Sequence, residues 1–180
     1  LGDVYKRQPM LHINGHTPGD KLSNIQQMDK FEITRKHLAT LWKDFNTADA
    51  NVDLVAIGSP HASLSECRNF VKFFNGKSCS PKVKTIITMG RDVLSQVKEE
   101  GILEELKRTG IQVISDICWC SITEPIFPDN TSVIMTNSGK YAHYAHGLTG
   151  RKTRFGSLED CAKTAQSGLA KSDLPSWLSN

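Results

Sequence analysis

The sequence predicts an α/β fold in which a mostly parallel sheet is flanked by helices. Four apolar runs of four to six residues have the character of buried strands. Stretches with the helical spacing of apolar side chains separate them, and strands that alternate with helices favour a parallel sheet. The chain has 180 residues, of which 38% are hydrophobic and 23% charged. It is therefore long enough for one domain with a substantial core.

The first part of the chain contains two strand signals and one helix signal. A short strand is expected at residues 11–13, before a loop rich in glycine and proline at residues 14–19. An amphipathic helix is expected over residues 34–45, where apolar side chains recur at Leu38, Leu41, Trp42 and Phe45. The apolar run at residues 52–57 predicts a buried strand that ends at Gly58.

A capping box marks the start of the next helix. Ser63 is the expected N-cap, and Glu66 follows three residues later, so each side chain can bind a backbone N–H group of the other residue. We expect this helix to end near Phe74. A second buried strand follows at residues 83–88, and polar residues begin soon after its end.

The same alternation continues in the second half of the chain. Helical sequence extends to Leu106 with an interruption at Gly101, and a third strand is expected at residues 111–115. The fourth strand is expected at residues 132–135. It leads into a polar stretch, residues 136–140, that opens another helix.

A second capping box predicts the last helix. Ser157 is its expected N-cap, Asp160 stands three residues later, and the helix should end near Ser167. Residues 171–180 form a C-terminal tail in this interpretation.

Composition excludes two classes of function and suggests a compartment. The net charge is +3 with scattered basic residues, so no basic stripe indicates nucleic-acid binding. No apolar run approaches the roughly 20 residues that span a membrane. Five cysteines without a secretory signal favour a reducing, cytoplasmic environment, in which they are free thiols or metal ligands rather than disulfides.

The first eight residues have an unusual origin in our interpretation. Residues 1–8, with the sequence LGDVYKRQ, translate back to a nucleotide string that contains the transposon end used to prepare sequencing libraries. We expect them to be an adapter artefact outside the fold. Native sequence is then expected to begin near Pro9, with further protein upstream.

Polar motifs follow every predicted strand of the sheet. They occupy residues 58–61, 89–91, 116–120 and 136–140. Because ligands of parallel α/β sheets bind outside the carboxyl ends of the strands, these motifs predict a functional site at that edge.

Two thiols follow the third strand and suggest a metal. Cys118 and Cys120 stand two residues apart, and thiolates are the usual ligands of iron–sulfur clusters. The alternative is that one or both of these cysteines are small hydrophobic residues buried in the core. A zinc site that adds His143 and His146 is a further alternative.

The motif after the fourth strand suggests an anion site. Asn137, Ser138 and Lys140 stand where free N–H groups at a helix N-terminus favour negative charge. The upstream glycine of a phosphate loop is absent, so a carboxylate or a phosphate group is favoured over a nucleotide. The alternative is a capped helix with a solvent-facing lysine.

Two further side chains at the predicted edge are candidates. His61 follows the first strand of the sheet and is the candidate catalytic residue. Arg91 follows the second strand and could clamp a carboxylate, although an ordinary arginine at a helix start fits equally well.

At these motifs the chain resembles the aconitase X family of the aconitase superfamily. The resemblance extends from Pro9 to about Gly168, and its most specific part is the string from Thr136 to Tyr144. The other matching stretches are residues 9–13, 17–18, 53–61, 116–120 and 154–161. The resemblance implies an aconitase-like three-layer domain, with residues 9–170 as the C-terminal portion of a larger catalytic domain.

The resemblance also implies a cofactor and missing parts. A family cysteine at the position of Cys118 ligates an iron–sulfur cluster, with Cys120 a less favoured ligand and further ligands upstream. Some members have a cysteine where this chain has Ser59, so the cluster type is left open. A swivel domain, fused or separate, supplies the serine expected to act as base. We therefore expect this chain to be inactive alone.

The implied reaction is the removal of water from a small hydroxy acid. An iron centre would act as a Lewis acid on the hydroxyl group, and a base would remove the proton next to the carboxylate. The preferred substrate is cis-3-hydroxy-L-proline, and 5-phosphomevalonate is the alternative within the family. A non-catalytic anion-binding or zinc-binding α/β domain is the alternative from another class.

Overall fold

The computed structural model describes residue 16 and residues 29–121, 123–171 and 173–179 of the chain. Contacts divide the chain into two units, Leu1–Ile33 and Thr34–Asn180. All secondary-structure elements described below belong to the second unit. The expected strand at residues 11–13 and the interpretation of residues 1–8 fall outside the described residues.

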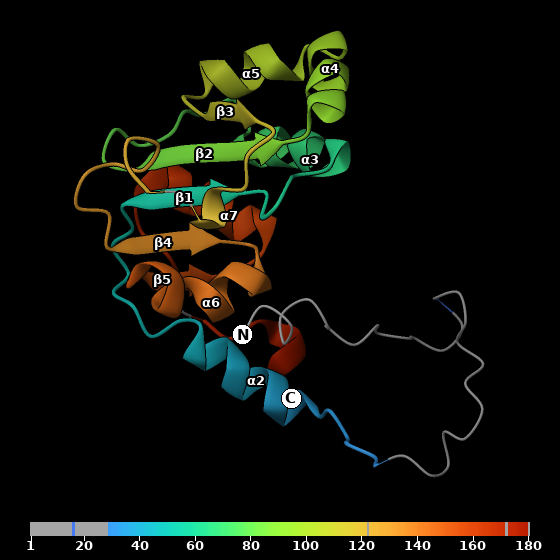
Figure 1. The fold of residues 1–180 in the computed structure, drawn as a ribbon, viewed down its shortest axis with the longest axis vertical. Helices are drawn as coiled ribbons and strands as arrows, with labels where there is room; N and C mark the ends of the chain where they lie inside the picture. The colour runs from blue at the N-terminus through green and yellow to red at the C-terminus, as the bar shows by residue number, and fades with distance from the viewer. Residues whose placement is uncertain (1–15, 17–28, 122, 172, 180) are drawn as a thin grey trace. The chain divides into compact units, whose positions relative to one another are not determined.

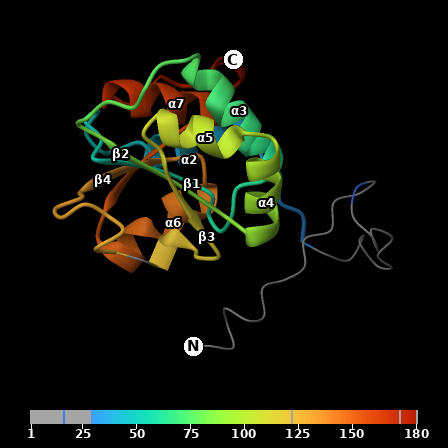
Figure 2. The same ribbon diagram turned by 90° about the horizontal axis from the view of Figure 1, so that it is seen from above.

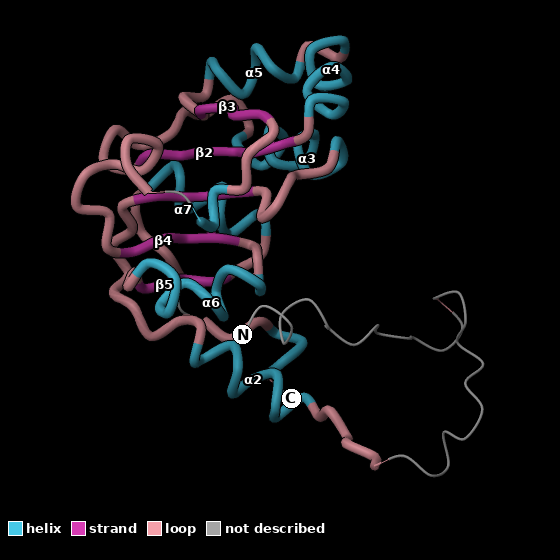
Figure 3. The backbone as a smooth tube through the Cα atoms, in the orientation of Figure 1, coloured by secondary structure: helices cyan, strands magenta, loops and turns pink. Residues whose placement is uncertain are grey.

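A five-stranded parallel sheet forms the centre of the second unit, as predicted (Figures 1 and 3). The strands lie in the order β3-β2-β1-β4-β5. Their bounds are β1 Leu54–Ile57, β2 Lys84–Met89, β3 Gln112–Ser115, β4 Val133–Thr136 and β5 Lys152–Phe155. The first four coincide with the predicted strands to within two residues, so apolar patterning located them correctly.

Strand β5 was not predicted from the sequence. Its four residues read Lys-Thr-Arg-Phe, and it pairs with β4 along the outer edge of the sheet. An edge strand needs no continuous apolar run, because one of its sides has no strand neighbour. Arg154 is nevertheless buried, and its Nη1 donates a hydrogen bond to the Asn46 carbonyl at 2.7 Å.

Helices cover both faces of the sheet (Figure 2). Helices α3 and α7 lie on one face, and α6 lies on the other. The helix bounds are α2 Arg35–Asp44, α3 Leu64–Phe74, α4 Arg91–Glu99, α5 Ile102–Arg108, α6 Gly139–Thr149 and α7 Leu158–Ser167, with short 3-10 helices η2 Trp119–Ser121 and η3 Ser176–Leu178. Within the described part of the chain no helix is long and apolar enough to cross a membrane.

Alternation along the strands creates two apolar clusters. Val55 and Ile57 join the cluster beneath α3 and α7, whereas Leu54 and Ala56 join the cluster beneath α6. All four side chains of β1 are fully buried. This explains why the central strand reads as a continuous apolar run rather than an alternating one.

The two predicted capping boxes are confirmed. Ser63 and Glu66 cap α3 reciprocally, and Ser157 and Asp160 do the same for α7. A third capping box, formed by Thr34 and His37, begins α2. Each box satisfies backbone N–H groups that the first helical turn leaves without partners, so helix starts are specified locally.

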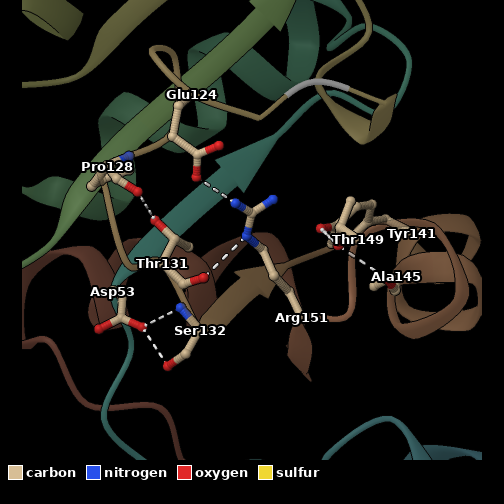
Figure 4. Close-up of polar contacts among 9 residues, drawn as sticks. All are labelled: Asp53, Glu124, Pro128, Thr131, Ser132, Tyr141, Ala145, Thr149 and Arg151. Carbon is tan, nitrogen blue, oxygen red and sulfur yellow. Dashed lines mark hydrogen bonds and ion pairs between the residues drawn. The ribbon is translucent and has the colours of Figure 1, made fainter.

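The amino-terminal edge of the sheet is held by polar contacts (Figure 4). Asp53, just before β1, accepts hydrogen bonds from the backbone N–H groups of Ser132 and Val133, both at 2.9 Å, and from the Ser132 hydroxyl at 3.0 Å. Arg151, just before β5, donates to the Thr131 carbonyl at 3.0 Å and pairs with Glu124 at 2.7 Å. These contacts align the starts of β1, β4 and β5.

We predict that Asp53 makes stability depend on pH. Burial raises the pKa of its carboxyl, but the hydrogen bonds from Val133 and Ser132 outweigh this effect and leave the pKa below its ordinary value. The ionised carboxylate therefore stabilises the fold above the ordinary aspartate pKa, and the contribution disappears as the pH falls through the folded-state pKa. Asp53→Asn should lower the free energy of unfolding by about 1 kcal/mol at pH 7.

Urea unfolding at several pH values between 7 and about 3 would measure this effect. The difference in the free energy of unfolding between wild type and Asp53→Asn should become smaller toward about pH 3. Asp129→Asn is the control, because that exposed loop carboxylate makes none of these contacts. If the difference in the free energy of unfolding between wild type and Asp53→Asn stayed constant with pH, Asp53 would not be the source of the pH dependence.

Candidate active site

The strand order places a topological switch point between β1 and β4. From β1 the chain moves outward to β2 and β3, and from β4 it moves outward to β5 on the other side. The helices that follow, α3 after β1 and α6 after β4, lie on opposite faces of the sheet. Such a topological switch point is where open α/β sheets bind ligands, outside the carboxyl ends of the strands.

Gly58 shapes the turn at the end of β1. Its φ is 87°, and a Cβ atom there would lie 2.2 Å from the Thr88 carbonyl oxygen and 2.7 Å from the Ala62 nitrogen. The Thr88 hydroxyl lies within hydrogen-bonding distance of the Gly58 and Pro60 carbonyls. Only glycine fits this turn, which fixes the segment carrying Ser59 and His61 against β2.

The two candidate thiols lie together beside this turn. The sulfur atoms of Cys118 and Cys120 are 2.9 Å apart. Trp119 between them is fully buried, and its ring centroid lies 4.3 Å from that of Tyr141 on α6. The aromatic contact anchors the segment, so both thiols are held by packing rather than by a mobile loop.

The environment of Cys118 favours the thiolate. Burial raises the pKa of this thiol, but hydrogen bonds from Cys120, the positive charge of Lys140 and the Ser59 hydroxyl together lower it below its ordinary value. By contrast, burial raises the pKa of Cys67 to about 11. Since the thiolate is the metal ligand, the structure distinguishes Cys118 from a cysteine of the core.

Ser59 presents a buried hydroxyl to the same region. Its Oγ has no hydrogen-bond partner of normal geometry among the described residues. It is nevertheless near enough to Cys118 to help lower the pKa of that thiol. A buried hydroxyl without a regular partner is costly, so this atom is suited to bind a group that the described residues do not supply.

The predicted anion motif begins α6. The Ser138 hydroxyl caps the helix by accepting a hydrogen bond from the Tyr141 N–H at 3.2 Å. Lys140 is exposed in the first turn, near enough for its charge to act on Cys118. The helix N-terminus and the lysine therefore place positive potential beside the thiols.

Asn137 is held by a contact with helix α3. Its Nδ2 donates a hydrogen bond to Glu66 Oε1 at 3.3 Å, joining the end of β4 to the first turn of α3. Sequence reasoning assigned Glu66 only a capping role. No local pattern marks this contact, because the two residues are 71 positions apart.

His61 and Arg91 lie in a neighbouring group around Asp116. Arg91 donates from its backbone N–H at 3.0 Å and from Nε at 2.9 Å to the Asp116 carboxylate. These hydrogen bonds, with a smaller contribution from the charge of His61, lower the pKa of Asp116. A substrate carboxylate would have to compete with Asp116 for Arg91, so the role of Arg91 in substrate binding stays a prediction.

The alternative zinc site is not assembled by the described residues. His143 and His146 are exposed on α6, and the His143 ring packs against Phe45 and Tyr144. No group of three or more histidine, cysteine or acidic side chains in the described part of the chain is placed to hold a metal. None of the five cysteines forms a disulfide bond in this structure.

Comparison with known proteins identifies the family of the chain. The sequence profile of the aconitase X third domain matches residues 52–167, which include β1, β4 and all four edge motifs. The chain belongs to the aconitase X family. The crystal structure of Thermococcus kodakaraensis aconitase X (holo-form) shares the fold, with a TM-score of 0.64 and 30% identity over 76% of this chain and 35% of that chain.

Two dehydratases are similar to this aconitase X chain over nearly its whole length. The cis-3-hydroxy-L-proline dehydratase of Hypocrea jecorina is 38% identical over 96% of the chain, and that of Pseudomonas aeruginosa is 36% identical over 95%. The phosphomevalonate dehydratase large subunit of Methanosarcina mazei is 26% identical over 88%. The chain spans about 30% of the length of the first two relatives and 38% of the third.

We predict that Gly58→Ala is strongly destabilising. The variant combines an unfavourable positive φ with a clash against β2, so it should cost more than about 1 kcal/mol. The control is Gly101→Ala, because Gly101 has a φ of 74° but no atom within 4 Å of its Cβ position. Urea unfolding of both variants separates clash from backbone strain. Equal decreases in the free energy of unfolding for the two variants would contradict a packing role for Gly58.

Proposed function

We propose that this chain is the C-terminal portion of an aconitase X dehydratase that removes water from cis-3-hydroxy-L-proline. One observation carries the proposal: a thiolate-favouring Cys118 and a positively charged helix N-terminus lie together at the switch point of the sheet. The similarity to two cis-3-hydroxy-L-proline dehydratases at 36–38% identity supports the choice of substrate.

The residues present fit part of an iron–sulfur site. Cys118 is the proposed ligand and Cys120 the second candidate, while the buried Ser59 hydroxyl points to a further group nearby. Two thiols do not complete a cluster, so we propose that the remaining ligands come from other parts of the protein. A bound cluster would supply Lewis-acid chemistry at the substrate hydroxyl.

The chain's own residues bind and orient the substrate in this proposal. Lys140 and the free N–H groups at the start of α6 hold the carboxylate, with Ser138 fixing the helix start. Asn137, directly before the N-cap of this helix, provides a further polar contact. Holding the carboxylate also stabilises the negative charge that develops there when the neighbouring proton is removed.

His61 is the residue of this chain that we propose to take part in proton transfer. It is exposed at the edge, and its charge acts on Asp116. A residue so placed can hold or pass on a proton near the leaving hydroxyl. The base that removes the substrate proton is proposed to be a serine of the swivel domain, so the chain alone should have no dehydratase activity. We place the complete enzyme in the cytoplasm.

We predict that Cys118, and not Cys79, holds the cluster. In the complete enzyme Cys118→Ala should lower iron per protein by about tenfold or more and remove the visible absorption band. Cys79→Ala is the matched control, because Cys79 is half-buried in the loop before β2, at the opposite edge of the sheet. Equal iron content in wild type and Cys118→Ala would refute the ligand assignment.

We predict that the complete enzyme prefers cis-3-hydroxy-L-proline over 5-phosphomevalonate. A phosphorylated substrate needs several converging cationic donors. The lysine and arginine side chains that the described residues bring to this edge are Lys140 and Arg91, and Arg91 is paired with Asp116. That supply suits one carboxylate better than a carboxylate and a phosphate.

Steady-state kinetics with both compounds on the complete enzyme would measure this preference. The kcat/KM for cis-3-hydroxy-L-proline should be at least about 100-fold higher, as expected when a substrate's charged group finds no partner. A higher kcat/KM for phosphomevalonate would reverse the choice of substrate and leave the hydro-lyase class intact.

A further inference from the structure

The hydrogen bond between Glu66 and Asn137 links the elements on the two sides of the switch point. Glu66 is in the first turn of α3, which follows β1, and Asn137 directly follows β4. The two strands are neighbours in the sheet. The pair therefore lies where the fold is expected to bind its ligand, and both side chains are only partly buried.

Glu66 fixes which way the Asn137 amide points. One carboxylate oxygen, Oε2, accepts hydrogen bonds from the Ser63 N–H and the Ser63 hydroxyl, both at 2.9 Å. The other, Oε1, faces Asn137 at 3.3 Å. An ionised carboxylate can only accept hydrogen bonds, so the amide must turn its NH₂ group toward Glu66. Its carbonyl oxygen is then the atom directed away from Glu66.

The carboxyl edge of the sheet here combines groups of opposite electrostatic character. Lys140 and the start of α6 attract a negative group, whereas Glu66 and the Asn137 carbonyl oxygen attract a donor with positive charge. An α-amino acid, whose carboxylate and amine are attached to the same carbon atom, matches both. A hydroxy acid without an amine would leave these acceptors without a partner, which is costly when the bound ligand excludes water from them.

We propose that Glu66 and Asn137 form the amine-recognition subsite, which makes the enzyme select substrates with a ring or α-amino group. The proposal rests on the function proposed above and deepens it by naming the group that sets specificity. Asn137 contacts the amine through its carbonyl oxygen. Glu66 is a positioning residue that orients Asn137 and adds negative charge.

Helix capping alone does not account for this geometry. Asp160 has the same capping role on α7, where it accepts hydrogen bonds from the Ser157 N–H at 3.0 Å and the Ser157 hydroxyl at 2.6 Å. Its carboxylate has no counterpart of Asn137 among the hydrogen bonds of the described residues. The two capping boxes can therefore be compared directly: the carboxylate of Glu66 also accepts a hydrogen bond from Asn137, whereas that of Asp160 has no such partner among the described residues.

The test compares two ring compounds of the same shape as competitive inhibitors of the complete enzyme. L-proline carries the ring amine, and cyclopentanecarboxylate has a methylene group in its place. Wild type should bind L-proline more tightly. Glu66→Gln should reduce this preference by about tenfold or more, because the side-chain amide that it introduces can also donate and so allows the Asn137 amide to reverse. Asn137→Ala should reduce it similarly.

Asp160→Asn should leave the preference unchanged, because it alters only a capping box. A Glu66→Gln enzyme that binds both inhibitors less tightly by the same factor would overturn the proposal, as would an equal loss of preference in Asp160→Asn. If Glu66→Gln does not fold, Asn137→Ala provides the test through the same ratio of inhibition constants for cyclopentanecarboxylate and L-proline. Failure of the proposed function is seen separately, as wild-type enzyme that does not dehydrate cis-3-hydroxy-L-proline.

Discussion

The parallel pairing of β1 with β4 is the constraint on which the rest of the structure depends. β1 is fully buried on both faces, and Leu54 and Val55 pair with Ile134 and Met135 of β4. The chain departs from this pair in opposite directions, so helices leave it on opposite faces of the sheet. A topological switch point at the carboxyl edge is a geometric consequence of that arrangement.

The two edges of this strand pair carry different kinds of polar contact. At the amino edge, Asp53 satisfies the first N–H groups of β4 and thereby stabilises the pairing. At the carboxyl edge, Ser59 has no regular partner among the described residues, and Lys140 is exposed. Asp53 at the first edge is thus used by the fold, whereas Ser59 and Lys140 at the second edge make no regular side-chain hydrogen bond among the described residues.

Packing on one face of the sheet connects the site to the core. Trp119 lies between Cys118 and Cys120 and is buried against Tyr141 of α6, the same helix whose N-terminus carries Lys140. The thiols and the N-terminal end of α6 are thus positioned by one apolar cluster. A change in that cluster would displace both together, which couples the proposed metal and substrate contacts.

The sequence by itself predicted four strands to within two residues of β1, β2, β3 and β4, the capping boxes of α3 and α7, and the edge of the sheet at which the polar motifs lie. These features are local: an apolar run, or a serine three residues before an acid, specifies its element without reference to distant residues. Family resemblance, carried by the string from Thr136 to Tyr144, is equally a property of contiguous sequence. The positions of Cys118, His61 and Lys140 at that edge followed from strand ends alone.

Only the tertiary structure decided which side chains meet. It added β5, which has no apolar run because it lies at the sheet edge. It paired Arg91 with Asp116 and Glu66 with Asn137 across 25 and 71 positions. Such contacts depend on strand order and on the faces that helices cover. Those are set by burial summed over the whole domain, and no short stretch of sequence contains them.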